Sequence, residues 1–246
     1  MPGCEAVGRS ADGTSNGALA ERAAIGNAHA VEVPKGANAA LAAGLGIAGL
    51  AGWLPFAWRA PLIGGEDVLV LGATGSVGLV AVQAAKLLGA ARVAAAGRRA
   101  AGLQRAVDLG ADAAIQLDEA GDLVTAFKEL FGGDGPSYVF DALWGEPGAA
   151  AVAASAPKAT IVNLGQSAGG TAALSSEAVR FKNLTILGMS VYGVPSGVLE
   201  EHYRRLVGHA MAGDIRLDIE QVPLDSVADA WRRQAEGAGA KLVVVP

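Results

Sequence analysis

The sequence contains a single cysteine, Cys4, among 246 residues, so no disulfide can form within the chain. Proteins with so little cysteine are typical of a reducing compartment. The segment that begins at Met1 also lacks the basic and then apolar pattern of a secretion signal. We therefore expect a cytoplasmic protein.

Positive charge is not concentrated anywhere in the sequence. There are 19 lysines and arginines against 24 acidic residues, which gives a net charge of −5, and the basic residues form no run. Proteins that bind nucleic acids need clustered positive charge to neutralise phosphates. Nucleic acid is therefore not an expected partner.

Long and strongly apolar runs are also missing. Residues 36–58 carry no charge and are numerous enough to cross a bilayer. The segment nevertheless consists largely of alanine and glycine, and it includes Asn38 and Pro55, which disfavour insertion. We expect a buried helix here and no membrane partner.

Apolar residues, at 52 % of the total, and 35 glycines dominate the composition. In the middle of the chain, short apolar runs alternate with helical patterns that end at glycine. A helix between two strands returns the chain to the same edge of the sheet, so this order predicts parallel strands. We expect an α/β fold with a doubly wound parallel sheet, whose strands are predicted at residues 67–71, 92–96, 113–117, 138–143, 160–164 and 184–187.

Three glycines, Gly72, Gly75 and Gly78, lie between the first predicted strand and the helix that follows. Glycines at such a turn let the backbone approach a pyrophosphate, and the helix N-terminus favours the anion. The spacing is a variant of the usual dinucleotide-binding pattern, and its place in a repeating β-α array supports the assignment. No Gly-Lys-Ser/Thr sequence follows, which excludes a P-loop. Thr74 replaces the glycine that a nucleophile elbow around Ser76 would need.

The end of the second predicted strand favours NADPH over NADH. NAD-binding domains usually place an acid there for the ribose 2′-hydroxyl, but this chain has Gly97-Arg98-Arg99. Guanidinium groups bind a 2′-phosphate in a bidentate way. Arg98 is the favoured contact and Arg99 the second candidate, against the alternative of a solvated pair that opens a helix.

With these residues in view, the chain resembles the medium-chain dehydrogenase/reductase superfamily, in its zinc-independent quinone-oxidoreductase-like branch. The likeness is carried by residues 41–53 (LAAGLGIAGLAGW), 65–90, 183–188 (NLTILG) and 241–246 (KLVVVP). The resemblance implies a Rossmann dinucleotide-binding domain beside a GroES-like β domain built from both termini. We assign residues 61–213 to the former, and residues 1–60 plus 214–246 to the latter as a partial domain.

The resemblance also implies a set of cofactor-binding residues. The glycine turn would hold the pyrophosphate, the end of the second strand the 2′-phosphate, and the ends of the fourth and fifth strands the ribose and nicotinamide. In that order, the expected residues are Gly72, Ala73, Thr74, Gly75, Ser76, Val77 and Gly78; Gly97, Arg98 and Arg99; and Leu143, Leu164, Gly165 and Gln166.

The chain departs from this family in two respects. Members usually have many more residues before the glycine turn than the 71 found here, so the chain appears shortened at its N-terminus and part of the usual substrate pocket is not expected. Where relatives often have threonine beside the nicotinamide, this chain has Ala51, which removes a possible hydroxyl donor.

Residues for metal or short-chain dehydrogenase chemistry are lacking. Zinc needs three or four ligands, and Cys4, His29, His202 and His209 give no cluster at a suitable spacing. No tyrosine is followed four residues later by lysine, as a short-chain dehydrogenase requires. We expect no metal site and assign no catalytic residue. Lys182 and Tyr192 are conceivable proton donors, better explained as structural residues.

Two functions remain after these exclusions. The first is an NADPH-dependent oxidoreductase that reduces a quinone, an enone or a similar conjugated carbonyl compound by hydride transfer without zinc. The alternative is an NADPH-binding protein or subunit without turnover of its own. A methyltransferase is less favoured, because it would need an acid for the ribose at the end of the second strand.

Three further expectations concern individual segments. The apolar run 185–192 is typical of an edge strand that pairs with a second copy, so we expect a homodimer. Asp141 is expected to cap the turn after its strand or to stabilise the edge of the sheet, rather than act as a catalytic acid. Trp144 could line the ligand site or simply pack, and the sequence leaves this open.

Overall fold

The computed structural model describes residue 20, residues 31–237 and residues 239–246. Cys4, His29 and most of the first thirty positions of the predicted smaller domain lie outside the described residues. The chain divides into two compact units, one made of Ala51–Gly193 and the other of the segment up to Leu50 with Val194–Pro246. The domain limits expected from the sequence were 61 and 213, and the GroES-like identity of the smaller unit stays a prediction.

The larger unit is built on six parallel strands in the order β3-β2-β1-β4-β5-β6. This arrangement confirms the doubly wound α/β fold. The central position belongs to β1, whose residues Val68, Leu69, Val70 and Leu71 are fully buried, as a strand covered on both faces requires. The strands are β1 (Asp67–Leu71), β2 (Arg92–Gly97), β3 (Ala113–Gln116), β4 (Tyr138–Asp141), β5 (Thr160–Asn163) and β6 (Thr185–Gly188).

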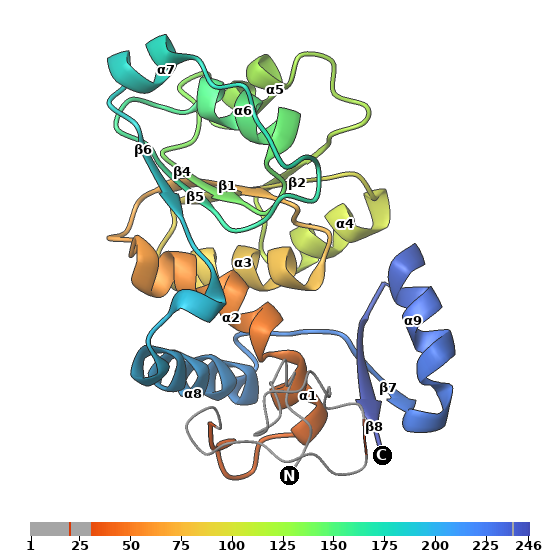
Figure 1. Ribbon diagram of the computed structural model, residues 1–246. Helices are drawn as coiled ribbons and strands as arrows, with labels where there is room; N and C mark the ends of the chain where they lie inside the picture. Colours follow the sequence, from red (N-terminus) through yellow and green to blue (C-terminus); the bar gives the residue numbers. More distant parts are fainter. Residues whose placement is uncertain (1–19, 21–30, 238) are drawn as a thin grey trace. The chain divides into compact units, whose positions relative to one another are not determined.

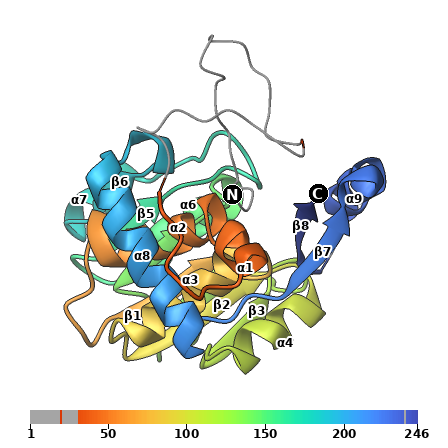
Figure 2. The ribbon, with the colours of Figure 1, turned by 90° about the horizontal axis from the view of Figure 1, so that it is seen from below.

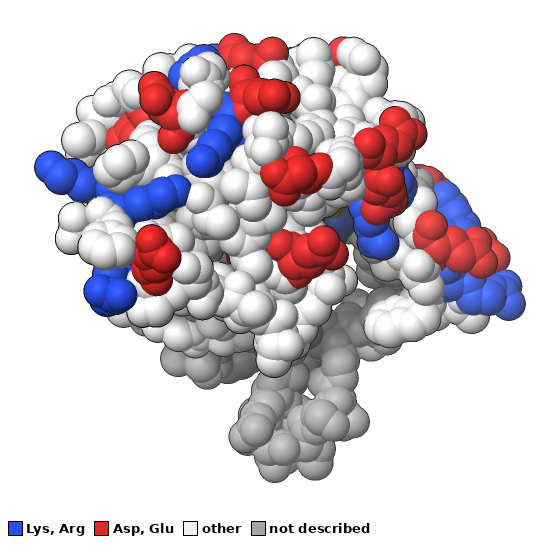
Figure 3. Space-filling view, turned by 90° about the horizontal axis from the view of Figure 1, so that it is seen from above, with Lys and Arg blue, Asp and Glu red and all other residues white. Residues whose placement is uncertain are grey.

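Helices cover both faces of this sheet. In Figure 1, α3 (Ser76–Leu87) and α4 (Ala100–Asp108) lie on one face. On the other lie α5 (Leu123–Glu129), α6 (Gly145–Ala154) and α7 (Ser176–Phe181). Figure 3 views the molecule from above, and acidic and basic side chains are interspersed there rather than segregated.

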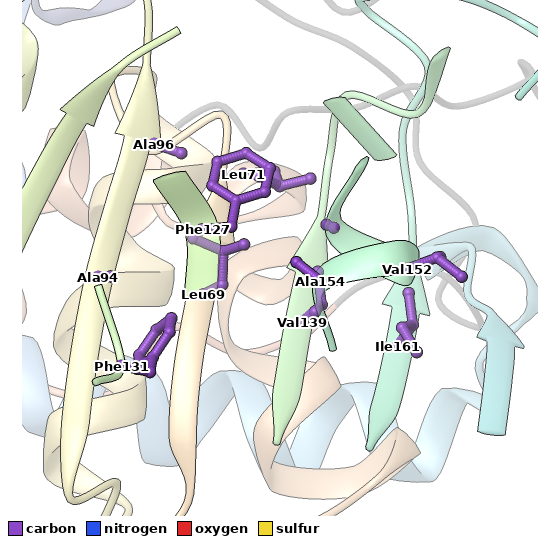
Figure 4. Packing of buried hydrophobic residues seen from close by; sticks show 11 residues of the cluster. Leu69, Leu71, Ala94, Ala96, Phe127, Phe131, Val139, Val152, Ala154 and Ile161 are labelled. Carbon is purple, nitrogen blue, oxygen red and sulfur yellow. The ribbon is translucent and has the colours of Figure 1, made fainter. Parts of the chain in front are cut away.

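The core between the sheet and α5 pairs large residues with small ones. Phe127 and Phe131 lie over the sheet in Figure 4, where Ala94 and Ala96 of β2 leave room for rings. All four residues are at most 2 % exposed. Close packing of this kind makes each substitution in the layer costly.

The uncharged segment 36–58 forms short helices rather than one long helix. They are α1 (Ala39–Gly44), α2 (Ile47–Leu54) and the π-helix η2 (Pro55–Arg59). Trp53 and Leu54 are fully buried, which confirms the expected buried helix. Over the described part of the chain, none of the helices has the length and apolar character needed to cross a membrane.

The smaller unit joins segments that are far apart in the sequence. The Tyr203 hydroxyl on α8 (Ser196–Ala212) donates a hydrogen bond to the Ala42 oxygen on α1, at 2.9 Å. A parallel pair, β7 (Ile219–Pro223) and β8 (Lys241–Val245), is connected through η4 (Leu224–Ser226) and α9 (Val227–Glu236). Figure 2 shows α9 beside this pair, where Arg233 forms a bidentate ion pair with Glu220 of β7.

Candidate dinucleotide-binding site

The candidate site lies at the carboxyl edge of the six-stranded sheet. The strand order changes direction between β1 and β4, since β2 and β3 follow on one side of β1 and β4 to β6 on the other. Ligands of doubly wound sheets bind outside the carboxyl ends of the strands at such a switch point. The glycine turn follows β1 at this place.

The fold does not require glycine equally at the three positions of the turn. Gly72 has a φ of +84°, a conformation that favours glycine. A Cβ on Gly78 would lie 2.3 Å from the Gly72 oxygen, so α3 could not pack this close to the turn with any larger residue. A Cβ on Gly75 would meet nothing within 4 Å, and its φ of −102° and ψ of 167° suit any residue. The fold therefore requires Gly72 and Gly78 but not Gly75.

The space beside Gly75 lies at the N-terminus of α3, which can bind an anion. Gly75 is the N-cap of α3, and no side chain caps this helix end. The first turn of a helix presents free N–H groups and a partial positive charge. With no side chain on residue 75, a pyrophosphate could approach the backbone of Ser76 and Val77, so the residues present fit a dinucleotide.

The end of β2 is connected directly to the glycine turn. Thr74 fills a notch left by two glycines, because a Cβ on Gly97 would lie 2.4 Å from its Cγ2 and one on Gly102 would lie 2.6 Å from its Cβ. Arg99, the N-cap residue of α4, donates from Nη2 to the Thr74 oxygen at 3.1 Å. Arg98 is exposed beside them. Arg99 is exposed as well, and it differs in its hydrogen bond to the turn.

The loops after β4 and β5 approach the same turn. The position of a Cβ on Gly72 lies 3.3 Å from Leu143 Cδ2. The Leu143 oxygen accepts a hydrogen bond from the Ala168 N–H at 2.9 Å, and a Cβ on Gly165 would lie 2.5 Å from the Ala142 oxygen. Gly72, Leu143 and the segment 164–166 are thus brought together, as expected from their place at the strand ends.

Asp141 connects the loop after β4 to the end of β5 through hydrogen bonds. Its Oδ1 accepts hydrogen bonds from the N–H groups of Leu143 and Trp144, both at 2.8 Å, and its Oδ2 accepts one from Asn163 Nδ2 at 3.2 Å. Asn163 also donates to the Gly165 oxygen at 2.9 Å. Burial raises the pKa of the Asp141 carboxyl, although these hydrogen bonds oppose the rise. The expected turn cap is confirmed, and it explains why β4 ends at residue 141 rather than at the predicted residue 143.

Trp144 adopts a backbone conformation that is costly for its residue type. Its φ is +53° and its ψ is −151°, and such conformations cost about 1–3 kcal/mol outside glycine. The next residue, Gly145, has no room for a Cβ, which would lie 2.9 Å from the Ala168 oxygen. Trp144 also forms an isolated parallel bridge with Gly169. The surroundings therefore hold Trp144 in this strained form.

Lys182, considered as a proton donor, has a structural role, and His202 is buried. Lys182 Nζ donates to the oxygens of Ala153 and Ser155, at 2.6 and 2.8 Å, and so caps the C-terminal end of α6. Burial and the nearby Lys128 lower the pKa of Lys182. His202, considered above as a metal ligand, is 5 % exposed on α8, and its burial lowers its pKa.

Sequence reasoning missed Asn163 and Gly102 at this edge of the sheet. Asn163 is a polar residue at the end of an apolar strand, which is a signal that could have been used. Gly102 lies in a helical pattern, where nothing local indicates its contact with Thr74.

Residues 76–208 match the family described as zinc-binding dehydrogenase. A curated relative, quinone oxidoreductase-like protein 2 of Rattus norvegicus, is 30 % identical over 131 residues, which cover 53 % of this chain and 37 % of the rat protein. The chain therefore spans little more than a third of that relative's length.

Solved structures agree on the fold. The mycobacterial protein Rv1454c, solved in complex with NADPH, matches with a TM-score of 0.82 and 22 % identity over 95 % of this chain and 74 % of that chain. An alcohol dehydrogenase zinc-binding domain protein from Burkholderia ambifaria matches with a TM-score of 0.76 and 28 % identity over 88 % of this chain and 58 % of that chain.

The name of the matched family implies zinc, and this can be tested on the side chains. Over residues 31–237 and 239–246, no three His, Cys, Asp or Glu side chains are grouped so that they could hold a metal ion. The described residues thus do not fit a zinc site. The family match, the rat relative and the strand order nevertheless agree with one another, and the chain belongs to the medium-chain dehydrogenase/reductase superfamily.

Proposed function

We propose that this protein is an NADPH-dependent oxidoreductase that reduces a quinone, an enone or a similar conjugated carbonyl compound without zinc. The observation that carries the proposal is the uncapped N-terminus of α3 behind Gly75, at the switch point of the sheet. The turn leaves room for a pyrophosphate beside Gly75, the glycine of the three that the fold does not require.

The preference for NADPH depends on Arg98. It is exposed at the end of β2, one residue after Gly97, where an NAD-binding domain usually has an acid. Arg99 is bound to the Thr74 oxygen, so Arg98 is the guanidinium proposed to pair with the 2′-phosphate. The NADPH complex of the similar mycobacterial protein supports this choice.

Bound NADPH would supply the hydride, which is the difficult part of the chemistry. The residues of this chain would bind the cofactor and orient it. The N–H groups of Ser76 and Val77 would hold the pyrophosphate, and Leu143 with the segment 164–166 would border the ribose and nicotinamide. Solvent would supply the proton that completes the reduction, so the proposal needs no dedicated acid.

The acceptor class is supported by the similarity to the rat quinone oxidoreductase-like protein. Zinc is left out because the described residues do not fit a zinc site. The single cysteine suits the cytoplasm as the place of action. We further propose a homodimer, in which the outer edge of β6 pairs with its counterpart in a second copy.

A titration of the purified protein with NADPH and, in parallel, with NADH tests the cofactor. We expect saturable binding of NADPH at least about tenfold tighter than that of NADH, which corresponds to about 1.4 kcal/mol. Loss of NADPH absorbance on addition of menadione then tests turnover. Binding without acceptor-dependent loss would identify an NADPH-binding protein, and no binding of either cofactor would refute the proposal.

A further inference from the structure

Trp144 has a strained backbone conformation next to the proposed cofactor site, and cofactor binding does not explain it. It lies at the carboxyl end of β4, directly after Leu143, whose side chain borders Gly72 of the glycine turn. Its φ of +53° and ψ of −151° are suited to glycine. A glycine at position 144 would adopt this backbone conformation without strain. The presence of tryptophan therefore indicates a role for its side chain.

The strained backbone is fixed from several directions. The Trp144 N–H donates to Asp141 Oδ1 at 2.8 Å, and the residue bridges to Gly169 in the loop after β5. Gly145 cannot carry a side chain, because the Ala168 oxygen is too close. The backbone of Trp144 is therefore fixed by the protein itself, and preorganisation of this kind favours binding.

The indole is seated on α6 but not enclosed. Its Cε3 lies 3.3 Å from the position that a Cβ of Gly148 would occupy, so the ring leans on the first turn of the helix where no side chain intervenes. The residue is only half-buried. Trp144 thus keeps part of its surface accessible at the edge of the sheet where the nicotinamide is proposed to lie.

We infer that Trp144 is a specificity-determining residue, whose indole forms a wall against which a planar conjugated acceptor such as a bicyclic quinone stacks. The inference rests on the proposed function and narrows its substrate class. Aromatic rings attract one another in stacked or tilted arrangements beyond the area they bury. An acyclic enone offers no ring for this contact, so it should bind without help from Trp144.

The test compares Trp144→Gly with Trp144→Phe, which keeps a ring, and with Trp231→Phe as a matched control on the exposed residue of α9 (72 % exposed). Menadione is the planar acceptor and mesityl oxide the acyclic one. For Trp144→Gly we expect KM for menadione to rise about fivefold, while KM for mesityl oxide and the Kd of NADPH stay within about twofold. Trp144→Phe should recover most of the menadione binding, and Trp231→Phe should behave like the parent protein.

Acceptor binding is also measured without turnover, by equilibrium dialysis of menadione against protein saturated with NADP⁺. A purely structural Trp144 would instead lower the melting temperature of Trp144→Gly and weaken both acceptors alike, which would overturn the inference. A parent protein that binds NADPH but not menadione would also overturn it and leave the cofactor assignment intact. Failure to bind NADPH would refute the proposed function itself.

Discussion

The Nη2 atom of Arg99 donates a hydrogen bond to the backbone oxygen of Thr74 at 3.1 Å and so connects the start of α4 to the glycine turn after β1. Arg98, its neighbour in sequence, is exposed at the same strand end. Both arginines are exposed, and Arg99 in addition binds the turn, so substitutions should separate their roles.

Replacing Arg98 by alanine should reduce the preference for NADPH over NADH by at least about tenfold, because a bidentate contact to the 2′-phosphate is lost. Arg99→Ala should instead weaken both cofactors by a similar factor, since it loosens the turn that holds their common pyrophosphate. Parallel fluorescence titrations measure both effects. Equal losses of preference in the two variants would contradict the assignment.

The glycines of the turn should respond in opposite ways to alanine. Gly78→Ala should lower the free energy of unfolding by about 1–3 kcal/mol, as overpacking does, because its Cβ would lie 2.3 Å from the Gly72 oxygen. Gly75→Ala should change that free energy by less than about 1 kcal/mol, because the poorer N-cap and the lower entropy of the unfolded chain oppose each other, yet it should weaken NADPH binding. Chemical denaturation and cofactor titration of both variants check this, and a stable Gly75→Ala with full affinity would argue against the pyrophosphate site.

Asp141→Asn should destabilise the protein by about 1–3 kcal/mol, because an amide NH₂ would face Asn163 Nδ2, which is also a donor. Burial raises the pKa of Asp141 above its ordinary value of 3.8, so the folded state binds the proton more strongly than the unfolded state. The stability that this provides is complete below pH 3.8 and is lost as the pH rises through the folded-state pKa. The advantage of the parent protein over Asp141→Asn should therefore shrink as the pH rises across that window.

Asp122, the N-cap of α5, offers a control of opposite sign. Hydrogen bonds from the Thr125 hydroxyl and backbone N–H lower its pKa. Its contribution is therefore present above pH 3.8 and lost as the pH falls through the folded-state pKa. Urea denaturation across acidic pH gives the difference in free energy of unfolding between the parent protein and each of Asp141→Asn and Asp122→Asn. Plotted against pH, the two differences should have slopes of opposite sign. Parallel slopes would contradict the description of at least one of the two carboxyls.

The edge of β6 is where a second copy is proposed to pair. Arg59 Nε already donates to the Gly188 oxygen at 3.0 Å, so the far end of the strand is occupied and Thr185–Leu187 remains for pairing. Thr185 is exposed, and Thr185→Lys would place a charged side chain on the edge strand, which disfavours pairing with a second copy. Light scattering should detect a dimer of the parent protein at micromolar concentration and a monomer of the variant; a monomeric parent would refute the pairing.

Much of the fold could be predicted because the signals are local. The strand at 67–71 is a continuous apolar run between polar residues, and the helix at 196–212 ends at Gly213, whose φ is +86°. The strand was predicted with the observed bounds. The glycine turn could be recognised for the same reason, since strand, glycines and helix are adjacent in the sequence.

What could not be predicted depends on contacts between distant segments. The notch that Thr74 fills requires Gly97 and Gly102, which belong to the next strand and helix. The strain at Trp144 depends on hydrogen bonds to Asp141 and on the bridge to Gly169. The hydrogen bond of Arg99 to Thr74 likewise follows from how α4 meets the turn, which no pattern in the sequence reveals.

The hydrogen bond between Tyr203 and Ala42 has a consequence for the order of events during synthesis. It joins positions 161 residues apart, whereas the unit Ala51–Gly193 is one uninterrupted stretch of chain. Domains generally fold as units, and contacts between remote positions close slowly. The contiguous unit can therefore fold while the ribosome is still adding residues, and the discontinuous unit must wait until α8 has emerged.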